Sequence, residues 1–358
     1  MSRPIMRESD DVGCRSTARL MAAARWLSRG RTCRPGTGTI ALSLQRLLTL
    51  GIGLVVGLTA TGALAEWPTG DVEYVIPFNP GGESDVSARL QQKYFEGLTG
   101  HQLVIRYRVG GGGAEAWSEL NQLPADGSVV MGTNLPHIVM QPLQGRAGYR
   151  TDEIATVYWF HYTPDAILVS ADSEFGTLDQ LVAFARAHPD LVTFSGSGTN
   201  TANHIAHTRF DQMAGIRTSY LPFTGTAPAE RAVLGGQVMA EWGYSTVAAQ
   251  HPDGLRMLAV ATEARVPLFP DVPTFRELGY DLVSGAYRGV AVPQTTPEDV
   301  KTEISAVIHE INQLPAFRRE MERAGFVLID VPYAEVDGFM TEITAGLKAT
   351  AAAMGVED

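Results

Sequence analysis

Short apolar runs alternate with amphipathic segments along most of the chain after residue 72. Apolar runs of this length, bounded by Gly, Pro and polar residues, are typical of buried strands, and apolar residues three or four positions apart are typical of helices. Strands are predicted at residues 73–78, 102–107, 128–132, 166–170, 192–195, 218–221, 238–242 and 256–261, and helices between them include 178–187, 202–213 and 228–234. This alternation predicts an α/β fold with mostly parallel strands.

The last part of the chain has a different pattern. Three helical segments, 297–312, 315–324 and 333–354, follow the apolar run at residues 287–292. Pro297 and Pro315 stand where proline is favoured, in the first turn of a helix. A chain that leaves one α/β unit, builds a second and returns to the first would form two lobes, but the pattern alone does not establish that return.

The first 65 residues have the features of an export signal. An Arg-rich stretch precedes an uncharged apolar run at residues 47–58, and Ala63-Leu64-Ala65 fits a cleavage site before Glu66. A membrane anchor is the alternative, although an uninterrupted span needs about 20 apolar residues and this run is shorter. We expect cleavage and a periplasmic mature protein. Translation that starts downstream, at Met21, is an open alternative.

Composition limits the chemistry of the mature chain. Cys14 and Cys33 are the two cysteines of the sequence, and both lie before the expected cleavage site. Removal of residues 1–65 leaves 19 Lys and Arg against 36 Asp and Glu, a formal net charge of −17. An acidic surface argues against nucleic acid or anionic lipid as a partner. It does not exclude a small anionic ligand, because local backbone dipoles can outweigh a diffuse charge.

The segment at residues 74–85 is the most informative part of the sequence. An apolar strand enters a Pro/Gly-rich turn that opens an amphipathic helix, with Ser84 and Asp85 as candidate capping residues. Glycine lets the backbone approach a ligand closely, and N–H groups at the start of a helix favour anions. The candidate contacts in this loop are Phe78, Asn79, Pro80, Gly81, Gly82, Ser84 and Asp85.

A second loop of the same kind occupies residues 194–204. It follows a predicted strand, opens a helix and offers the candidate contacts Ser197, Gly198, Thr199, Thr201 and His204. Small hydroxyl residues beside glycines provide donors without a general base in an obvious position. Neither loop contains the Gly-x-Ser-x-Gly pattern of a nucleophile elbow. An ordinary capped turn is the alternative for either loop taken alone.

Two weaker patterns have structural explanations. Four consecutive glycines, residues 110–113, follow a strand and precede a helix, but the later glycine of a dinucleotide motif is missing. We expect them to let the helix pack against the first loop. His204 and His207 could share a helical face as metal ligands, but no third ligand stands near them in the sequence. No metal and no cofactor is expected.

The order of these segments resembles the Bug/TctC family, the solute-binding receptors of tripartite tricarboxylate transporters. Matching segments run from Trp67-Pro68 through both loops, the Gly132–Asn134 segment and the Pro222–Gly225 segment to Pro270–Thr274. The resemblance implies a two-lobed periplasmic binding protein, type II-like, with a mostly parallel sheet flanked by helices in each lobe and a hinge between them. It places lobe 1 at residues 66–163 and 287–358 and lobe 2 at residues 164–286.

The resemblance also implies further ligand contacts and shows departures from the family pattern. By position, the additional contacts are Thr133, Asn134, His137, Phe223, Thr224, Glu241, Trp242 and Arg288. Family members commonly carry Lys or Glu where this chain has Thr224, and Glu241-Trp242 replaces other polar residues. Arg288-Gly289 is similar to the tricarboxylate-binding branch, so Arg288 is a candidate to bind a second carboxylate. A hinge arginine paired with a surface carboxylate is the alternative.

The expected function is therefore capture of a small organic carboxylate, with a di- or tricarboxylate favoured. The resemblance implies delivery to the large and small membrane subunits of a tripartite tricarboxylate transporter, and a monomer is expected. A receptor for a signalling system and a secreted α/β enzyme, with Asp85 or His204 as base, are the alternatives. Ligand identity is not determined by the sequence.

Overall fold

The computed structural model describes residues 67–145 and 147–355. The predicted leader and its cleavage site before Glu66 lie outside the described residues. Among the residues that are described, no helix is both long and apolar enough to cross a membrane.

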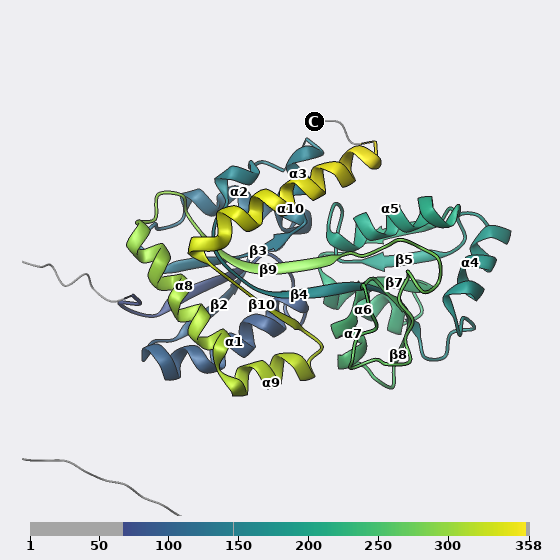
Figure 1. The fold of residues 1–358 in the computed structure, drawn as a ribbon, viewed down its shortest axis with the longest axis horizontal. Helices are drawn as coiled ribbons and strands as arrows, with labels where there is room; N and C mark the ends of the chain where they lie inside the picture. Colours follow the sequence, from purple (N-terminus) through teal and green to yellow (C-terminus); the bar gives the residue numbers. More distant parts are fainter. Residues whose placement is uncertain (1–66, 146, 356–358) are drawn as a thin grey trace, which may run out of the picture. The chain divides into compact units, whose positions relative to one another are not determined.

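Lobe 1 is built on a six-stranded part of the sheet (Figure 1). Its parallel strands are β1 (Val72–Ile76), β2 (Leu103–Tyr107) and β3 (Val129–Leu135). Three antiparallel strands complete it: β9 (Gly285–Val292) beside β3, then β4 (Ala155–Ser170) and β10 (Val327–Pro332). The predicted parallel strands are present, but the returning strands make this sheet mixed.

Helices cover both faces of this sheet and enclose one hydrophobic core. They are α1 (Glu83–Thr99), α2 (Ala114–Glu119), α3 (His137–Leu143), α8 (Glu298–Gln313), α9 (Pro315–Arg323) and α10 (Tyr333–Ala353). Short 3₁₀ turns occur at Gly111–Gly113, Leu120–Gln122 and Thr151–Glu153. The core draws on residues from both ends of the described chain, such as Trp67, Trp117 and Phe317. Both ends of the described chain therefore contribute to one core.

Lobe 2 repeats the plan at smaller size. Its strands β5 (Thr193–Gly196), β6 (Ser219–Pro222) and β7 (Ala240–Tyr244) are parallel, and β8 (Leu255–Val260) is antiparallel to β4. The helices are α4 (Leu178–Ala187), α5 (Ala202–Ala214), α6 (Thr226–Leu234) and α7 (Ser245–Gln250). Two clusters of buried apolar side chains lie in this lobe, separate from the core of lobe 1.

Strand β4 connects the lobes. Its first part, through Pro164, pairs with β9, and from Asp165 onward it pairs with β7 and β8. The chain passes back to lobe 1 where β9 begins, at Gly285. The predicted lobe boundaries, 163/164 and 286/287, fall inside these two strands, which lie side by side. A smaller contact between the lobes is apolar and joins Met140 of α3, Ile205 of α5 and Ala351 of α10.

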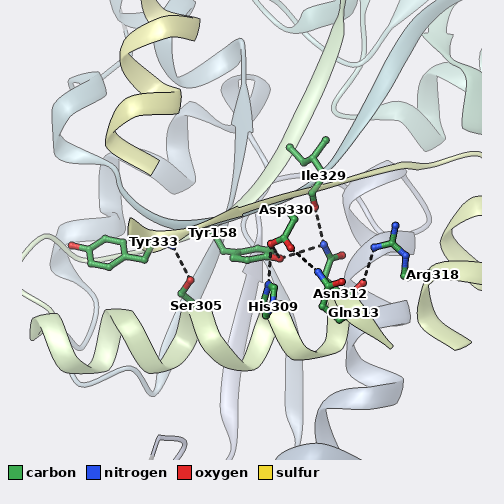
Figure 2. A network of polar contacts seen from close by, with 9 residues as sticks. All are labelled: Tyr158, Ser305, His309, Asn312, Gln313, Arg318, Ile329, Asp330 and Tyr333. Carbon is green, nitrogen blue, oxygen red and sulfur yellow. Dashed lines mark hydrogen bonds and ion pairs between the residues drawn. The ribbon is translucent and has the colours of Figure 1, made fainter. Parts of the chain in front are cut away.

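A polar network attaches the C-terminal strand β10 to lobe 1 (Figure 2). The Asp330 carboxylate accepts hydrogen bonds from the Tyr158 hydroxyl at 2.7 Å and from Gln313 Nε2 at 2.6 Å, and it lies 2.9 Å from His309 Nδ1. Asn312 donates to the backbone carbonyl of Ile329 at 2.7 Å. Because α8 supplies three of these partners, helix and strand are held in one register. This strand was not predicted from the sequence.

Two predicted helix starts need correction. Ser84 and Asp85 do not cap α1, because Gly82 occupies the N-cap position and the helix already begins at Glu83. Pro297 is the N-cap of α8 rather than a residue of its first turn. Pro315 does stand in the first turn of α9, as predicted.

Candidate functional site

The first predicted loop lies between β1 and α1, at the edge of lobe 1 that faces lobe 2. Gly81 has φ of +80°, a left-handed conformation that favours glycine. The Asp85 carboxylate accepts a 2.7 Å hydrogen bond from the Gly81 amide and another of 2.7 Å from the Tyr107 hydroxyl, and it pairs with Arg89 at 3.0 Å. Asp85 is therefore fully engaged in holding the loop. It is not oriented to bind ligand or to act as a base.

The second predicted loop is held from within lobe 2. Thr201, the N-cap residue of α5, donates from its hydroxyl to the Gly198 carbonyl at 2.9 Å. Ser197 donates from its hydroxyl to Asn203 Oδ1 at 2.5 Å, and Asn203 Nδ2 donates to Asp165 Oδ1 at 3.0 Å. A chain of hydrogen bonds thus fixes Ser197 to the crossing strand β4.

The two lobes touch across the cleft through glycine-rich backbone. A Cβ placed on Gly82 would lie 3.4 Å from the amide nitrogen of Ala227 in α6. One placed on Gly112 would lie 2.9 Å from the carbonyl oxygen of Thr199. The tetraglycine segment thus contacts the second loop, which the sequence did not predict.

The same segment also serves the packing that was expected of it. Gly113 leaves room for the ring of Trp117 in α2. Trp117 in turn meets Phe78 of the first loop edge-on, with ring centroids 6.2 Å apart. The short helix α2 therefore packs against the first loop.

A small cavity, here called the inner cavity, lies where these loops meet. Its volume is about 10 Å³, and it is lined by Phe78, Glu83, Ser84, His137 and Arg288 from lobe 1 and by Ser197, Thr226 and Tyr244 from lobe 2. A space of this size holds about one water molecule. Five of its lining residues were predicted to bind ligand, and the structure brings those five together.

Arg288 is the strongest chemical feature of the inner cavity. The residue is 4% exposed, and its guanidinium lies over the Tyr244 ring, 5.1 Å from the centroid. Its Nε donates to the Ser84 hydroxyl at 3.3 Å, whereas Nη1 is buried without a hydrogen-bond partner among the described residues. Burying a charged group is costly unless it is paired. The site therefore offers a buried, unused donor to an anion that enters between the lobes.

Two more polar groups of the inner cavity lack hydrogen-bond partners among the described residues. His137 Nδ1 and the Tyr244 hydroxyl are buried and have no partner within the described part of the chain. Burial, with the nearby Arg288 charge, lowers the pKa of His137 well below its usual value. His137 is thus a neutral group at neutral pH, packed edge-on against Phe78 at 5.8 Å between centroids.

Glu83 is a site residue that the sequence analysis missed. The residue is 3% exposed, its Oε2 accepts a 2.5 Å hydrogen bond from Thr246 of lobe 2, and its Oε1 has no partner in residues 67–145 or 147–355. Burial raises the pKa of Glu83, and the Arg288 charge opposes that rise. Its position between Gly82 and Ser84, inside a loop already singled out, was the available signal. Thr226, which also lines the cavity, was missed as well, and its position directly after Gly225 was the available signal.

A larger cavity, here called the outer cavity, is also lined by residues of both lobes. Its volume is about 410 Å³, and it is lined by Gly111, Gly112, Ala114, Gln141, Gln144, Ala147, Gly198, Thr199, Asn200, Pro222, Phe223 and Thr224. In each lobe, some residues that line the two cavities are near one another in sequence. Gln141 follows His137 by one helical turn, and Gly198 directly follows Ser197. Four predicted residues, Gly198, Thr199, Phe223 and Thr224, lie here.

Several predicted contacts do not line either cavity. Trp242 is fully buried in the core of lobe 2, stacked on Phe275 with centroids 5.6 Å apart. Glu241 is also fully buried, and burial, reinforced by the nearby Glu230, raises its pKa well above the usual value. The remaining predicted residues outside both linings are Asn79, Pro80, Gly81, Gly82, Asp85, Thr133, Asn134, Thr201 and His204. Asn134 nevertheless reaches Arg288: in the amide orientation that satisfies both its polar atoms, its oxygen accepts from Arg288 Nε at 3.0 Å.

His204 is used inside the second loop. Its Nδ1 accepts a 3.1 Å hydrogen bond from the Asn200 amide, and its ring packs on Tyr220 with centroids 4.7 Å apart. The neighbouring His207 contacts the Thr218 hydroxyl through Nε2 at 2.7 Å. Within the described ranges, no group of three or more His, Cys, Asp or Glu side chains is placed to hold a metal ion.

Two α/β lobes that close over a polar cavity define a solute-binding receptor. The model of the tripartite tricarboxylate transporter family receptors (TctC) matches residues 87–350, and the chain belongs to this family of periplasmic solute-binding proteins.

Among similar sequences, a UPF0065 protein from the tcbD-tcbE intergenic region of Pseudomonas sp. (strain P51) is 27% identical, over 78% of this chain and 86% of that protein. Protein BugT of Bordetella pertussis is 25% identical over 84% of this chain and 95% of its own length.

Solved structures of the same fold include the periplasmic binding protein BugD, with a TM-score of 0.77 at 22% identity, covering 81% of this chain and 99% of BugD. A protein of R. palustris solved with adipate has a TM-score of 0.76 at 23% identity, over 81% of this chain and 99% of that one. MatC of Rhodopseudomonas palustris, solved with malate, has a TM-score of 0.73 at 22% identity, over 79% of this chain and 99% of MatC. These likenesses support the fold.

Proposed function

We propose that this receptor captures a small organic carboxylate, with di- and tricarboxylates as the favoured class, in the cleft between its lobes. The observation that carries the proposal is the buried Arg288, which lines the inner cavity and whose Nη1 lacks a partner among the described residues. A carboxylate that accepted from Nη1 would form a charge-assisted hydrogen bond. The adipate and malate complexes of the two R. palustris proteins support this ligand class.

The contacts from both lobes give the ligand a means of holding the cleft shut. A ligand shifts an equilibrium between open and closed states only through contacts that differ between them. Ser84 and Arg288 of lobe 1 and Ser197 and Tyr244 of lobe 2 line the same cavity, so a ligand held there contacts both lobes. The closed form then delivers its ligand to the large and small membrane subunits of a tripartite tricarboxylate transporter.

Export to the periplasm and action as a monomer belong to the same proposal. N-terminal sequencing of protein recovered from the periplasm should give Glu66 as the first residue. A membrane-bound product that keeps residues 47–58 would contradict export by cleavage.

The central test is the identity of the ligand that the protein retains. Native mass spectrometry of gently purified protein, followed by denaturation and analysis of the released small molecules, should yield a carboxylate in unchanged form. Isothermal titration of the emptied protein with that compound should give saturable one-to-one binding. A retained ligand without any carboxyl group would overturn the proposal.

A further inference from the structure

The inner cavity contains a negative group as well as a positive one, and this limits which carboxylates fit it. Glu83 and Arg288 both line the cavity, and both are almost completely buried. Each keeps one buried polar atom without a partner in the described residues, Oε1 of Glu83 and Nη1 of Arg288. One cavity thus presents an unused acceptor and an unused donor to the same ligand.

The position of Glu83 is fixed by both lobes. It is the first residue of α1, and its Oε2 is held at 2.5 Å by the Thr246 hydroxyl. Because Oε2 is already engaged, Oε1 is the oxygen left for a ligand. Charge-assisted hydrogen bonds of this kind are short and strong, so the carboxylate orientation is well defined when the lobes are closed.

A ligand made only of carboxylates would meet Glu83 unfavourably. One carboxylate could pair with Arg288, but a second would add negative charge near a buried acid with no donor for Oε1. Uncompensated charge in a low-dielectric site is unfavourable. A ligand that carries a donor beside its carboxylate removes this conflict, because it satisfies Arg288 and Glu83 together.

We infer that the ligand bears a hydrogen-bond donor, an ammonium above all, on the carbon next to the carboxylate that binds Arg288. The ammonium donates to Glu83 Oε1 and the carboxylate accepts from Arg288 Nη1, while the rest of the molecule extends toward the outer cavity. Glu83 is then a specificity-determining residue, and amino carboxylates are preferred over plain ones. This inference rests on the proposed function and narrows it.

The test uses ligands that differ at one position. Succinate, malate and aspartate carry hydrogen, hydroxyl and ammonium on the same carbon, and adipate with 2-aminoadipate gives a longer pair. Affinities are measured by titration calorimetry for the native protein, for Glu83→Gln and for Glu73→Gln. The last variant removes the same charge from Glu73, a half-buried residue that pairs with Arg106.

The native protein and Glu73→Gln should bind the amino member of a pair at least about tenfold more tightly than the plain acid, the least expected for one charge-assisted bond. In Glu83→Gln this preference should fall below about threefold. The plain acid should bind more tightly to this variant than to the native protein. Glutamine keeps an oxygen for Thr246, and urea unfolding of each variant verifies that it is folded.

Two results would overturn the inference while leaving the proposed function intact. One is a plain dicarboxylate bound as tightly as its amino counterpart, with calorimetry in buffers of different ionisation enthalpy showing that Glu83 takes up a proton. The other is an amino preference that persists in Glu83→Gln. By contrast, recovery of a retained ligand that has no carboxyl group would remove the proposed function and this inference together.

Discussion

The Thr246 hydroxyl donates a 2.5 Å hydrogen bond to Oε2 of Glu83. Thr246 lies at the start of α7 in lobe 2 and Glu83 at the start of α1 in lobe 1, so this bond spans the cleft. Both side chains are buried, which shields the bond from competing water. It stabilises the closed arrangement independently of any ligand.

Thr246→Val should shift the unliganded protein toward more open forms. Valine keeps the shape of threonine but cannot donate, and the loss of a hydrogen bond to a charged group costs about 1.5–3 kcal/mol. Small-angle scattering should therefore give a larger radius of gyration for the variant without ligand. Thr262→Val is the matched control, because the buried Thr262 hydroxyl has no partner in the described chain. Identical scattering from Thr246→Val and the native protein would mean that the bond does not hold the lobes together.

Gly112→Ala should weaken ligand binding by obstructing closure. Its Cβ would lie 2.9 Å from the Thr199 carbonyl oxygen across the cleft, closer than real Cβ contacts come. Gly111→Ala is the control, since Gly111 has a similar φ, +58° against +64°, but its Cβ would meet only Ala114 and Glu115 of its own lobe. The backbone strain of about 1 kcal/mol is then common to both variants. Calorimetry should show an affinity loss of tenfold or more for Gly112→Ala alone, and equal losses in the two variants would attribute the effect to strain.

Arg288→Ala should weaken binding of the retained carboxylate by about 10- to 100-fold. The variant loses a charge-assisted hydrogen bond worth about 1.5–3 kcal/mol, and Arg288→Lys should recover only part of it, because lysine lacks the planar guanidinium. Urea unfolding of each variant verifies that it is folded, because loss of the Arg288 charge leaves the buried Glu83 carboxyl without a neighbouring cation. Arg106→Ala, which removes an exposed arginine, should bind normally. Unchanged affinity in Arg288→Ala would move the anion site elsewhere.

Local patterns predicted much of the fold, and the reasons for the failures are physical. The strands and helices of the two parallel units have strong periodicity, so α4 is found at its predicted residues and α5 within one residue. β10 was missed because its residues are only partly buried and its position depends on contacts of Asp330 with distant residues. The long β4 was predicted only in its last part, since nothing local indicates that one strand serves two lobes.

The site was predictable as two loops but not as a set of side chains. Phe78, Ser84 and Ser197 lie in glycine-rich turns whose sequence alone indicates close approach. Whether a residue in such a loop faces the cleft depends on tertiary contacts. Asp85 is turned toward Gly81 and Tyr107, whereas its neighbour Glu83 faces the cavity. Trp242 was assigned to the site from its position in the family order, yet its ring completes an aromatic core.

Asp165→Asn should remove a pH dependence of stability that arises at the hinge. Asp165 is fully buried on β4, and its Oδ2 has no partner among the residues described. Burial raises its pKa to about 7, although Ser284, Asn203 and the charges of Arg288 and Arg209 favour the ionised form. The folded protein therefore holds a proton that the unfolded chain, with a pKa of about 3.9, releases. Stability should fall as pH rises from about 4 to 7 and then level off, by roughly 4 kcal/mol for a shift of this size. Asparagine keeps an oxygen for Asn203 and carries no charge. Residue 165 of Asp165→Asn should therefore not lower the free energy of unfolding between pH 4 and 7.

Urea unfolding at pH 4.5, 6 and 8 should show the variant gaining stability relative to the native protein as pH rises. Asp190→Asn, at an exposed position, should instead follow the native curve. Parallel curves for Asp165→Asn and the native protein would mean that Asp165 is already ionised in the folded state.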